Sequence, residues 1–331
     1  MYWEKKCFKE VRLEMWAKGK GTMKTAIIGA GRNRSGIGQY IGKYFQKNGA
    51  SIISVLGTTE KTARKAASVL TQYGIDATYY TDFYDMAERE RPDAIVIASP
   101  ESSHLKYLLK CIETGVHVFC EKPFIKQDKN DTDITLLLDE IFEQAECKKL
   151  KIAMNSQWLF SLPFYEALCG PVDKQKTNTF FIRLSPMVSG KEMIFDSVPH
   201  ALSILYYVFS DGQIDNLNIK ADKEKITIKF HYIFTTGRCA VRIELVRTIH
   251  QPRNFSYGFN NKIVHRVLDL NRYDIFFMYS DRILKISDPL ELSVRDFISA
   301  VRDNREPRIG KFHIVNNIYL LKKIYNYSKT I

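Results

Sequence analysis

Two short stretches of this chain carry the residue types that could polarise an oxygen and move a proton. Glu121-Lys122-Pro123 follows an apolar stretch, and Asp196 and His200 lie four residues apart in DSVPH. A lysine ammonium can hydrogen-bond a reacting oxygen and stabilise the charge that develops on it. An imidazole near a helix start feels the positive end of the helix dipole, which favours its neutral, proton-accepting form. We therefore predict Lys122, His200 and Asp196 as catalytic residues.

A glycine-rich loop is the second candidate site. Gly29-Ala30-Gly31 follows one apolar stretch and precedes an amphipathic one, where glycines and a helix N-terminus suit a dinucleotide pyrophosphate. Four residues separate Gly31 from Gly36, whereas the usual fingerprint has two. A tight structural turn is the alternative explanation.

The residues at the end of the second apolar stretch suggest the type of dinucleotide. That stretch ends in Thr58 and Thr59 and lacks the acid that usually binds the ribose of NAD, while Arg32 and Arg34 lie in the glycine loop. Guanidinium groups suit a 2′-phosphate. We predict NADP(H) as the favoured cofactor, with NAD(H) as the alternative.

The elements that must position these residues alternate in type along the first half of the chain. Short apolar stretches predict strands at residues 24–30, 51–57, 77–80, 93–100, 116–122 and 150–155. Amphipathic stretches predict helices between several of them, at residues 39–48, 60–73, 102–114 and 133–149. This alternation predicts an α/β fold with a doubly wound parallel sheet of the Rossmann type.

The second half has a different rhythm. One helix is predicted at residues 196–210, followed by strands without intervening helices at 213–221, 225–236, 239–248, 261–270 and 273–286, and then by two helices at 292–304 and 312–328. Successive strands joined by short turns predict an antiparallel sheet with one open face. We expect Ile226, Ile228 and Phe230 on that open face, where they would favour a homo-dimer or homo-tetramer.

Composition and charge narrow the class of protein. With 45% hydrophobic and 26% charged residues the chain is typical of a globular protein, and no apolar run is long enough to span a membrane. Its beginning has no apolar signal core, so we expect a cytoplasmic protein. The six cysteines form no CxxC pair, and we predict neither disulfides nor a bound metal. The net charge is +12, of which residues 1–22 and 305–331 contribute eight. Solvated helix faces explain it more simply than a nucleic-acid partner, which we do not predict.

The stretch DAIVIASPESSHLKYLLKCIETGVHVFCEKPF, residues 93–124, resembles the Gfo/Idh/MocA family, the glucose-fructose oxidoreductase and inositol dehydrogenase group. The resemblance extends from residue 23 to the end of the chain. It implies a Rossmann domain at residues 23–155 and a substrate-binding and oligomerisation α/β domain, with a large and mostly antiparallel sheet, at residues 156–331. Residues 1–22 would form a leader outside both domains.

The resemblance also implies a function. Most such proteins are NAD(P)-dependent oxidoreductases of sugars, nucleotide sugars and cyclitols, in which the lysine of Glu-Lys-Pro faces substrate and cofactor and the histidine of Asp-x-x-x-His is the acid/base. This chain departs from the pattern at Pro199, where the family has glycine, and at Ser203, where it often has an acid. A cofactor-binding regulatory or sensor protein without catalysis is therefore the alternative. Single residues also have alternative explanations. Lys122 could be a solvated charge at a strand end, and Asp196 could be a helix cap with His200 beside it only by chance.

The predicted binding residues fall into two sets. Those for the cofactor lie in the glycine loop and at strand ends: Gly29, Gly31, Arg32, Arg34, Gly36, Ile37, Thr58, Thr59, Ser99, Pro100, His104, Glu121 and Lys122. Those for the substrate follow the sixth strand: Asn155, Gln157, Trp158 and Tyr165. Packing is the alternative for Trp158, near where relatives carry an arginine, and also for His104 at its helix start.

Overall fold

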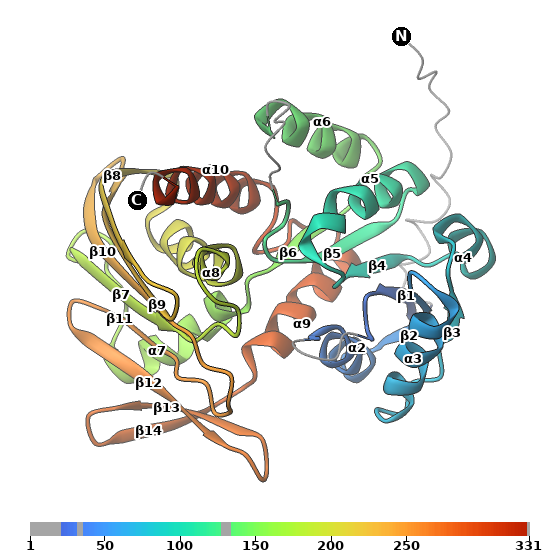
Figure 1. Ribbon diagram of the computed structural model, residues 1–331, viewed down its shortest axis with the longest axis horizontal. Helices are drawn as coiled ribbons and strands as arrows, with labels where there is room; N and C mark the ends of the chain where they lie inside the picture. Colours follow the sequence, from blue (N-terminus) through green and yellow to red (C-terminus); the bar gives the residue numbers. More distant parts are fainter. Residues whose placement is uncertain (1–20, 32–35, 127–133, 330–331) are drawn as a thin grey trace.

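The computed structural model describes residues 21–31, 36–126 and 134–329. Two sheets dominate these residues, with helices on and between them (Figure 1). Most of the predicted leader, together with Arg32 and Arg34, lies outside the described residues. Within the described residues no helix is long and apolar enough to cross a membrane.

The first sheet has six parallel strands in the order β3-β2-β1-β4-β5-β6, which is the Rossmann order and confirms the predicted fold. The strands are β1 (Met23–Ile28), β2 (Ala50–Leu56), β3 (Thr78–Tyr80), β4 (Ala94–Ile97), β5 (His117–Glu121) and β6 (Ile152–Asn155). The central strand β4 is buried along its whole length, because helices cover both faces of the sheet.

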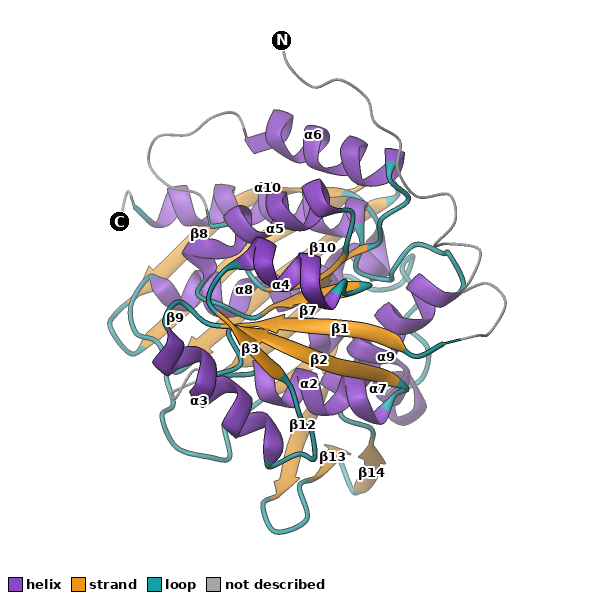
Figure 2. Cartoon of the chain, turned by 90° about the vertical axis from the view of Figure 1, so that its right-hand side faces the viewer, coloured by secondary structure: helices purple, strands orange, loops and turns teal. Residues whose placement is uncertain are grey.

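Two groups of helices provide that cover (Figure 2). The core on one face includes side chains of α2 (Gly38–Lys47) and α3 (Glu60–Thr71). The core on the other face includes side chains of α4 (Phe83–Glu90), α5 (His104–Thr114) and α6 (Ile134–Cys147). Helix α4 was not predicted. It begins at Asp82, whose carboxylate accepts hydrogen bonds from two backbone N–H groups of the first turn.

The second sheet has eight strands in the order β14-β13-β12-β11-β7-β10-β9-β8, and neighbours are antiparallel except β7 and β10. The strands are β7 (Thr179–Leu184), β8 (Gly212–Ala221), β9 (Lys225–Phe234), β10 (Gly237–Val246), β11 (Ser256–Phe259), β12 (Lys262–Asp269), β13 (Asp274–Tyr279) and β14 (Arg282–Ile286). The mostly antiparallel sheet is confirmed. Strands β7 and β11 were not predicted, and the stretch at 273–286 is a hairpin rather than one strand.

One face of this sheet packs against helices α8 (Glu192–Phe209) and α10 (Lys311–Ser328). Ile226, Ile228 and Phe230 are buried on that covered face, so their predicted place on the open face is wrong. The alternation of apolar and polar residues along β9 was predicted, but the apolar residues were assigned to the wrong face of the sheet. Lys229 and His231 point to the open face instead.

Helix α9 (Pro289–Arg302), which lies within the predicted second domain, packs against elements of the first. Its residue Phe297 packs against Phe45 of α2 and Phe119 of β5, with ring centroids 6.0 and 5.4 Å apart. The Tyr44 hydroxyl donates a hydrogen bond of 2.6 Å to Asp288, which begins the helix. A segment beyond residue 155 therefore completes the core of the first sheet.

Candidate active site

The backbone around the glycine loop leaves little room for side chains. Gly29 has a φ of +95°, and a Cβ at this position would lie 2.5 Å from the backbone nitrogen of Ser99. At Gly31 a Cβ would lie 3.3 Å from the carbonyl oxygen of Thr62. The carboxyl ends of β1 and β4 thus approach each other closely, as they do where a dinucleotide crosses such a sheet.

The start of helix α2, which follows this loop, suits the binding of an anion. Ile37 precedes its first residue without a side-chain cap, and its first turn carries no acidic residue. The backbone N–H groups at the start of a helix have no partner within the helix, and they attract anions. The described part of the loop therefore fits a pyrophosphate. Gly36 leads into this helix start.

The residues at the end of β2 are the ones expected near the ribose of a bound dinucleotide. Thr59 is committed to capping α3, because its hydroxyl accepts from the Thr62 N–H at 3.3 Å and its own N–H donates to the Thr62 hydroxyl at 3.0 Å. Thr58 is exposed. Arg64 is paired with Glu60 at 2.6 Å and lies over the ring of Tyr79.

Lys122, which follows β5, contacts helix α8 in the second half of the chain. The Lys122 ammonium donates hydrogen bonds to Asp196, to its carbonyl oxygen at 2.5 Å and its carboxylate at 2.9 Å. Burial alone would raise the pKa of Asp196, but the Lys122 ammonium outweighs burial, and the pKa is lowered. The Lys122–Pro123 peptide bond is cis. This ion pair joins the end of the parallel sheet to helix α8.

Glu121, just before this lysine, is buried beneath the ion pair. The amide of Asn155, at the end of neighbouring β6, donates a hydrogen bond to its carboxylate. Burial raises the pKa of Glu121 in spite of the adjacent Lys122. Asn155 is itself 1% exposed, so both side chains are buried at the ends of β5 and β6, where they bind each other.

His200 lies one turn beyond Asp196 on α8. Its imidazole is neutral for a different reason from the one we predicted. Helix α8 begins at Glu192, so His200 sits in its third turn and Pro199 lies inside the helix. The helix dipole therefore does not keep the imidazole neutral. Burial does, with help from the Lys122 ammonium, and it lowers the pKa of His200 to about 3.

The hydrogen bond that orients His200 comes from Ser156, not from Asp196. The fully buried Ser156 hydroxyl lies 3.2 Å from His200 Nδ1 and donates to the Pro199 carbonyl oxygen at 3.2 Å. A hydroxyl that donates to the carbonyl oxygen can accept a hydrogen bond from Nδ1–H, and in that tautomer the lone pair is on Nε2. The second Asp196 carboxylate oxygen accepts from the Ser197 hydroxyl instead, at 2.9 Å.

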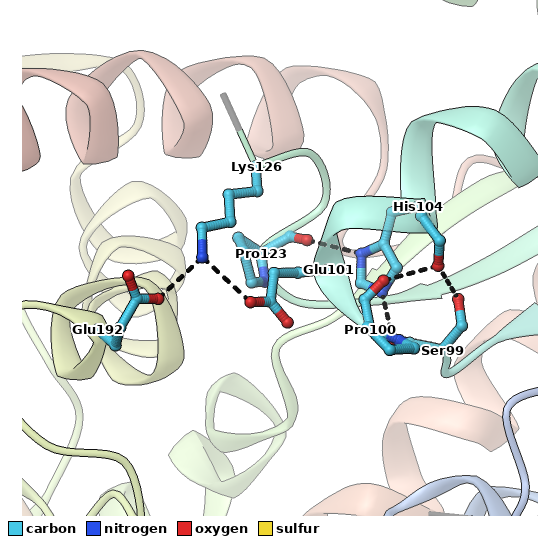
Figure 3. A network of polar contacts seen from close by, with 8 residues as sticks. Ser99, Pro100, Glu101, His104, Pro123, Lys126 and Glu192 are labelled. Carbon is cyan, nitrogen blue, oxygen red and sulfur yellow. Dashed lines mark hydrogen bonds and ion pairs between the residues drawn. The ribbon is translucent and has the colours of Figure 1, made fainter. Parts of the chain in front are cut away.

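His104 is held on both sides by backbone carbonyl oxygens. Its Nδ1 lies 2.9 Å from the Pro123 oxygen and its Nε2 lies 3.0 Å from the Ser99 oxygen (Figure 3). Burial lowers its pKa. A neutral imidazole donates to one of these two oxygens, and so His104 connects the ends of β4 and β5. This position agrees with the packing alternative, and the cofactor contact of His104 stays a prediction.

The Lys126 ammonium lies between two carboxylates at the edge of the site. It pairs with Glu101 at 3.1 Å and with Glu192 at 2.8 Å (Figure 3). Burial would lower the pKa of Lys126, but the two carboxylates raise it. Lys122 and Lys126 are four residues apart, and so are their partners Asp196 and Glu192. The Lys126–Glu192 pair is therefore a second ion pair between the end of β5 and α8.

Two predicted substrate residues belong to the packing. Trp158 stacks on Phe255 with ring centroids 3.6 Å apart, and the Tyr165 hydroxyl donates to the carbonyl oxygen of Lys262 at 3.0 Å. Both are almost completely buried. Their burial supports packing, which was the alternative for Trp158, and the substrate contacts of Trp158 and Tyr165 stay predictions. Gln157 remains partly exposed.

Several residues of the site were not predicted. Ser156 lies inside a stretch that we had singled out, but a serine between two larger polar residues gives no signal of its own. The matched spacing of lysines and acids could have revealed Lys126 and Glu192. Asn317 of α10, which donates to the Pro199 carbonyl oxygen at 2.9 Å, had no detectable signal.

Metal ligands do not gather in the described parts of the chain. No group of three His, Cys, Asp or Glu side chains there could hold a metal ion. The five described cysteines are free, and all but Cys147 are buried.

Comparison with known proteins agrees with this architecture. Residues 23–153 match the model of the Gfo/Idh/MocA oxidoreductase family, which is described as having an NAD-binding Rossmann fold. Residues 23–153 thus form a Rossmann domain of the Gfo/Idh/MocA family. The matched range includes Gly29, His104 and Lys122.

Curated relatives match over part of their length. Oxidoreductase P35 of Formosa agariphila is 23% identical over 202 residues, which cover 55% of this chain and 59% of that protein. An inositol 2-dehydrogenase of Klebsiella pneumoniae is 34% identical over 104 residues, which cover 31% of this chain and 29% of that protein. The chain therefore matches less than two thirds of the length of either relative.

Solved structures extend the likeness to both sheets. A UDP-N-acetylglucosamine 3-dehydrogenase from Acidithiobacillus ferrooxidans has a TM-score of 0.67 at 16% identity, over 92% of this chain and 97% of the other. An inositol dehydrogenase homologue from Azotobacter vinelandii, solved with NADH and myo-inositol, has a TM-score of 0.68 at 12% identity, over 94% and 96%. At these identities the fold is what is shared.

Proposed function

We propose that this protein is an NAD(P)-dependent oxidoreductase that moves a hydride between a nicotinamide and a hydroxyl or carbonyl carbon of a sugar, nucleotide sugar or cyclitol. The observation that carries the proposal is the ion pair between Lys122, at the end of β5, and Asp196, which lies one turn before His200 on α8. The Lys122 ammonium also contributes to the lowered pKa of His200. The glycine loop and the uncapped start of α2 support binding of the dinucleotide.

The residues divide the chemistry between them. The nicotinamide, when bound, supplies or accepts the hydride. Lys122 hydrogen-bonds the substrate oxygen and stabilises the negative charge that develops there. His200, neutral and with its Nε2 lone pair available, takes the hydroxyl proton during oxidation and returns it during reduction. Asp196 keeps the Lys122 ammonium in place, and Ser156 holds the His200 tautomer.

The cofactor preference is proposed as NADP(H), with NAD(H) as the alternative. It rests on the absence of an acid at the Thr58-Thr59 end of β2, and on Arg32 and Arg34 in the part of the loop outside the described residues. Michaelis constants measured for both cofactors test it. A strong preference for NADH would contradict it.

The experiment for the function is direct. Purified protein is incubated with NADPH or NADH and a panel of keto-sugars and keto-cyclitols, while the nicotinamide absorbance is followed. We expect oxidation of the cofactor by at least one carbonyl compound, and its loss in the Lys122→Ala variant. A protein that binds the cofactor and never oxidises it would instead be the non-catalytic sensor.

We also propose that copies of the chain assemble through the open face of the second sheet. Arg183 and Arg242 pair there with Glu244, which is almost fully buried, and they flank the ring of Phe181. Exposed apolar side chains lie on the same face, among them Ile233 and Met278. Light scattering tests this proposal: we expect the mass of two or four chains, and a monomer at micromolar concentration would contradict it.

A further inference from the structure

Two arginines of the second sheet lie side by side close to the candidate active site. Arg266 of β12 donates from its guanidinium to the carbonyl oxygen of Arg253, in the loop between β10 and β11. The Arg266 guanidinium covers the ring of Trp158, with its carbon 5.4 Å from the ring centroid. Both arginine side chains are only partly exposed.

This pair is not neutralised by the described parts of the protein. Neither guanidinium has a carboxylate within ion-pair distance among the described residues. Burial, and then the charge of Arg253, lower the pKa of Arg266. Asp288 acts on it from farther away, but its carboxylate already accepts hydrogen bonds from the Tyr44 hydroxyl and the Leu290 N–H. Like charges held together away from water are costly unless an anion joins them.

The pair adjoins the catalytic histidine. Arg253 is close enough to contribute to the lowered pKa of His200. Trp158, which Arg266 covers, follows Ser156 by two residues, and the Ser156 hydroxyl contacts His200 Nδ1. The arginines and His200 come from the second half of the chain, whereas the glycine loop already offers backbone donors to cofactor phosphates.

We propose that Arg253 and Arg266 bind an anionic group, a phosphate or a carboxylate, of the substrate. The inference rests on the proposed function and narrows it: the substrate is a sugar phosphate, a nucleotide sugar or a sugar acid rather than a neutral polyol. The planar guanidinium fork matches both anions with two parallel hydrogen bonds. An anion here would also offset the effect of Arg253 on His200 and make the imidazole a stronger base.

Calorimetry on the NADP(H)-saturated protein tests the anion site without requiring turnover. The probes are glucose 1-phosphate, glucuronate, inorganic pyrophosphate and, as the neutral match, glucose. The variant is Arg253→Gln, because this side chain is partly exposed in a loop and its loss should leave the fold intact. Arg238→Gln, which removes an exposed arginine at the start of β10, is the matched control.

We expect at least one charged probe to bind more tightly than glucose and to lose affinity as salt is raised. Arg253→Gln should weaken that probe by about 10- to 100-fold, the range expected for a charge-assisted hydrogen bond, and should leave glucose unchanged. Arg238→Gln should change neither. The phosphate and carboxylate probes show which anion the site prefers.

Three results would overturn the inference: none of the charged probes binds, glucose binds as tightly as they do, or Arg253→Gln weakens NADP(H) in place of the probes. Failure of the proposed function looks different. A charged probe that binds through Arg253, in a protein that transfers no hydride to any carbonyl compound, would leave the anion site standing and remove the oxidoreductase.

Discussion

The burial of His200 predicts that this side chain makes the protein less stable in acid. Its pKa is about 3 in the folded protein and about 6.5 in an unfolded chain. Because the folded pKa is depressed, the unfolded state binds the extra proton first. Stability is therefore fully present above pH 6.5 and is lost as the pH falls toward 3. At 1.36 kcal/mol per pH unit, His200 alone costs about 2 kcal/mol at pH 5 and about 4 kcal/mol at pH 3.

Urea unfolding of the native protein and of His200→Asn at pH 7.5, 6 and 5 measures this contribution. The variant cannot charge at this site, so the difference in unfolding free energy between the two proteins should shift by about 2 kcal/mol in favour of the variant between pH 7.5 and 5. Other groups titrate equally in both proteins and cancel. Parallel curves would show that His200 has an ordinary pKa and is not buried as described.

Three further predictions concern positions around the site. Gly29→Ala should abolish measurable cofactor binding in a fluorescence titration, because the new Cβ would lie 2.5 Å from a backbone nitrogen at a φ of +95°; retained affinity would contradict the close approach of β1 and β4. Ser156→Ala should lower kcat by about 5- to 100-fold, the cost of an unpaired buried imidazole N–H, while cofactor affinity stays the same; an unchanged kcat would refute its role in setting the tautomer. Lys126→Met should lower the free energy of unfolding by about 1 kcal/mol in chemical denaturation, whereas Lys106→Met, an exposed control, should not; equal effects would deny the tie between β5 and α8.

The sequence was sufficient to predict the parallel sheet and the sheet edge at which Gly29 and Lys122 lie. Buried parallel strands are continuous apolar runs, and their carboxyl ends gather at one edge, so Gly29 and Lys122 were placed by a general rule. The spacing of Asp196 and His200 placed both on one side of a helix.

Other features depended on contacts that no local pattern encodes. In the sequence, Pro199 suggested the first turn of a helix, but helix α8 continues through it. The loss of one backbone hydrogen bond is tolerated where the helix is packed on both sides. Strand β7 enters the sheet parallel to β10, a pairing between segments about 60 residues apart. Helix α9 is amphipathic like any surface helix, and its sequence does not say that its apolar face completes the first core. Arg253 and Arg266 meet across the β11–β12 hairpin, and β11 was not among the predicted strands.

The most direct test of the central claim is the single-turnover rate of hydride transfer in Lys122→Ala, measured beside the dissociation constant of the cofactor. If Lys122 stabilises charge on the reacting oxygen, the rate should fall by about 10²- to 10⁴-fold while cofactor affinity changes little. An unaltered rate, or a loss of rate fully explained by lost cofactor binding, would contradict the account.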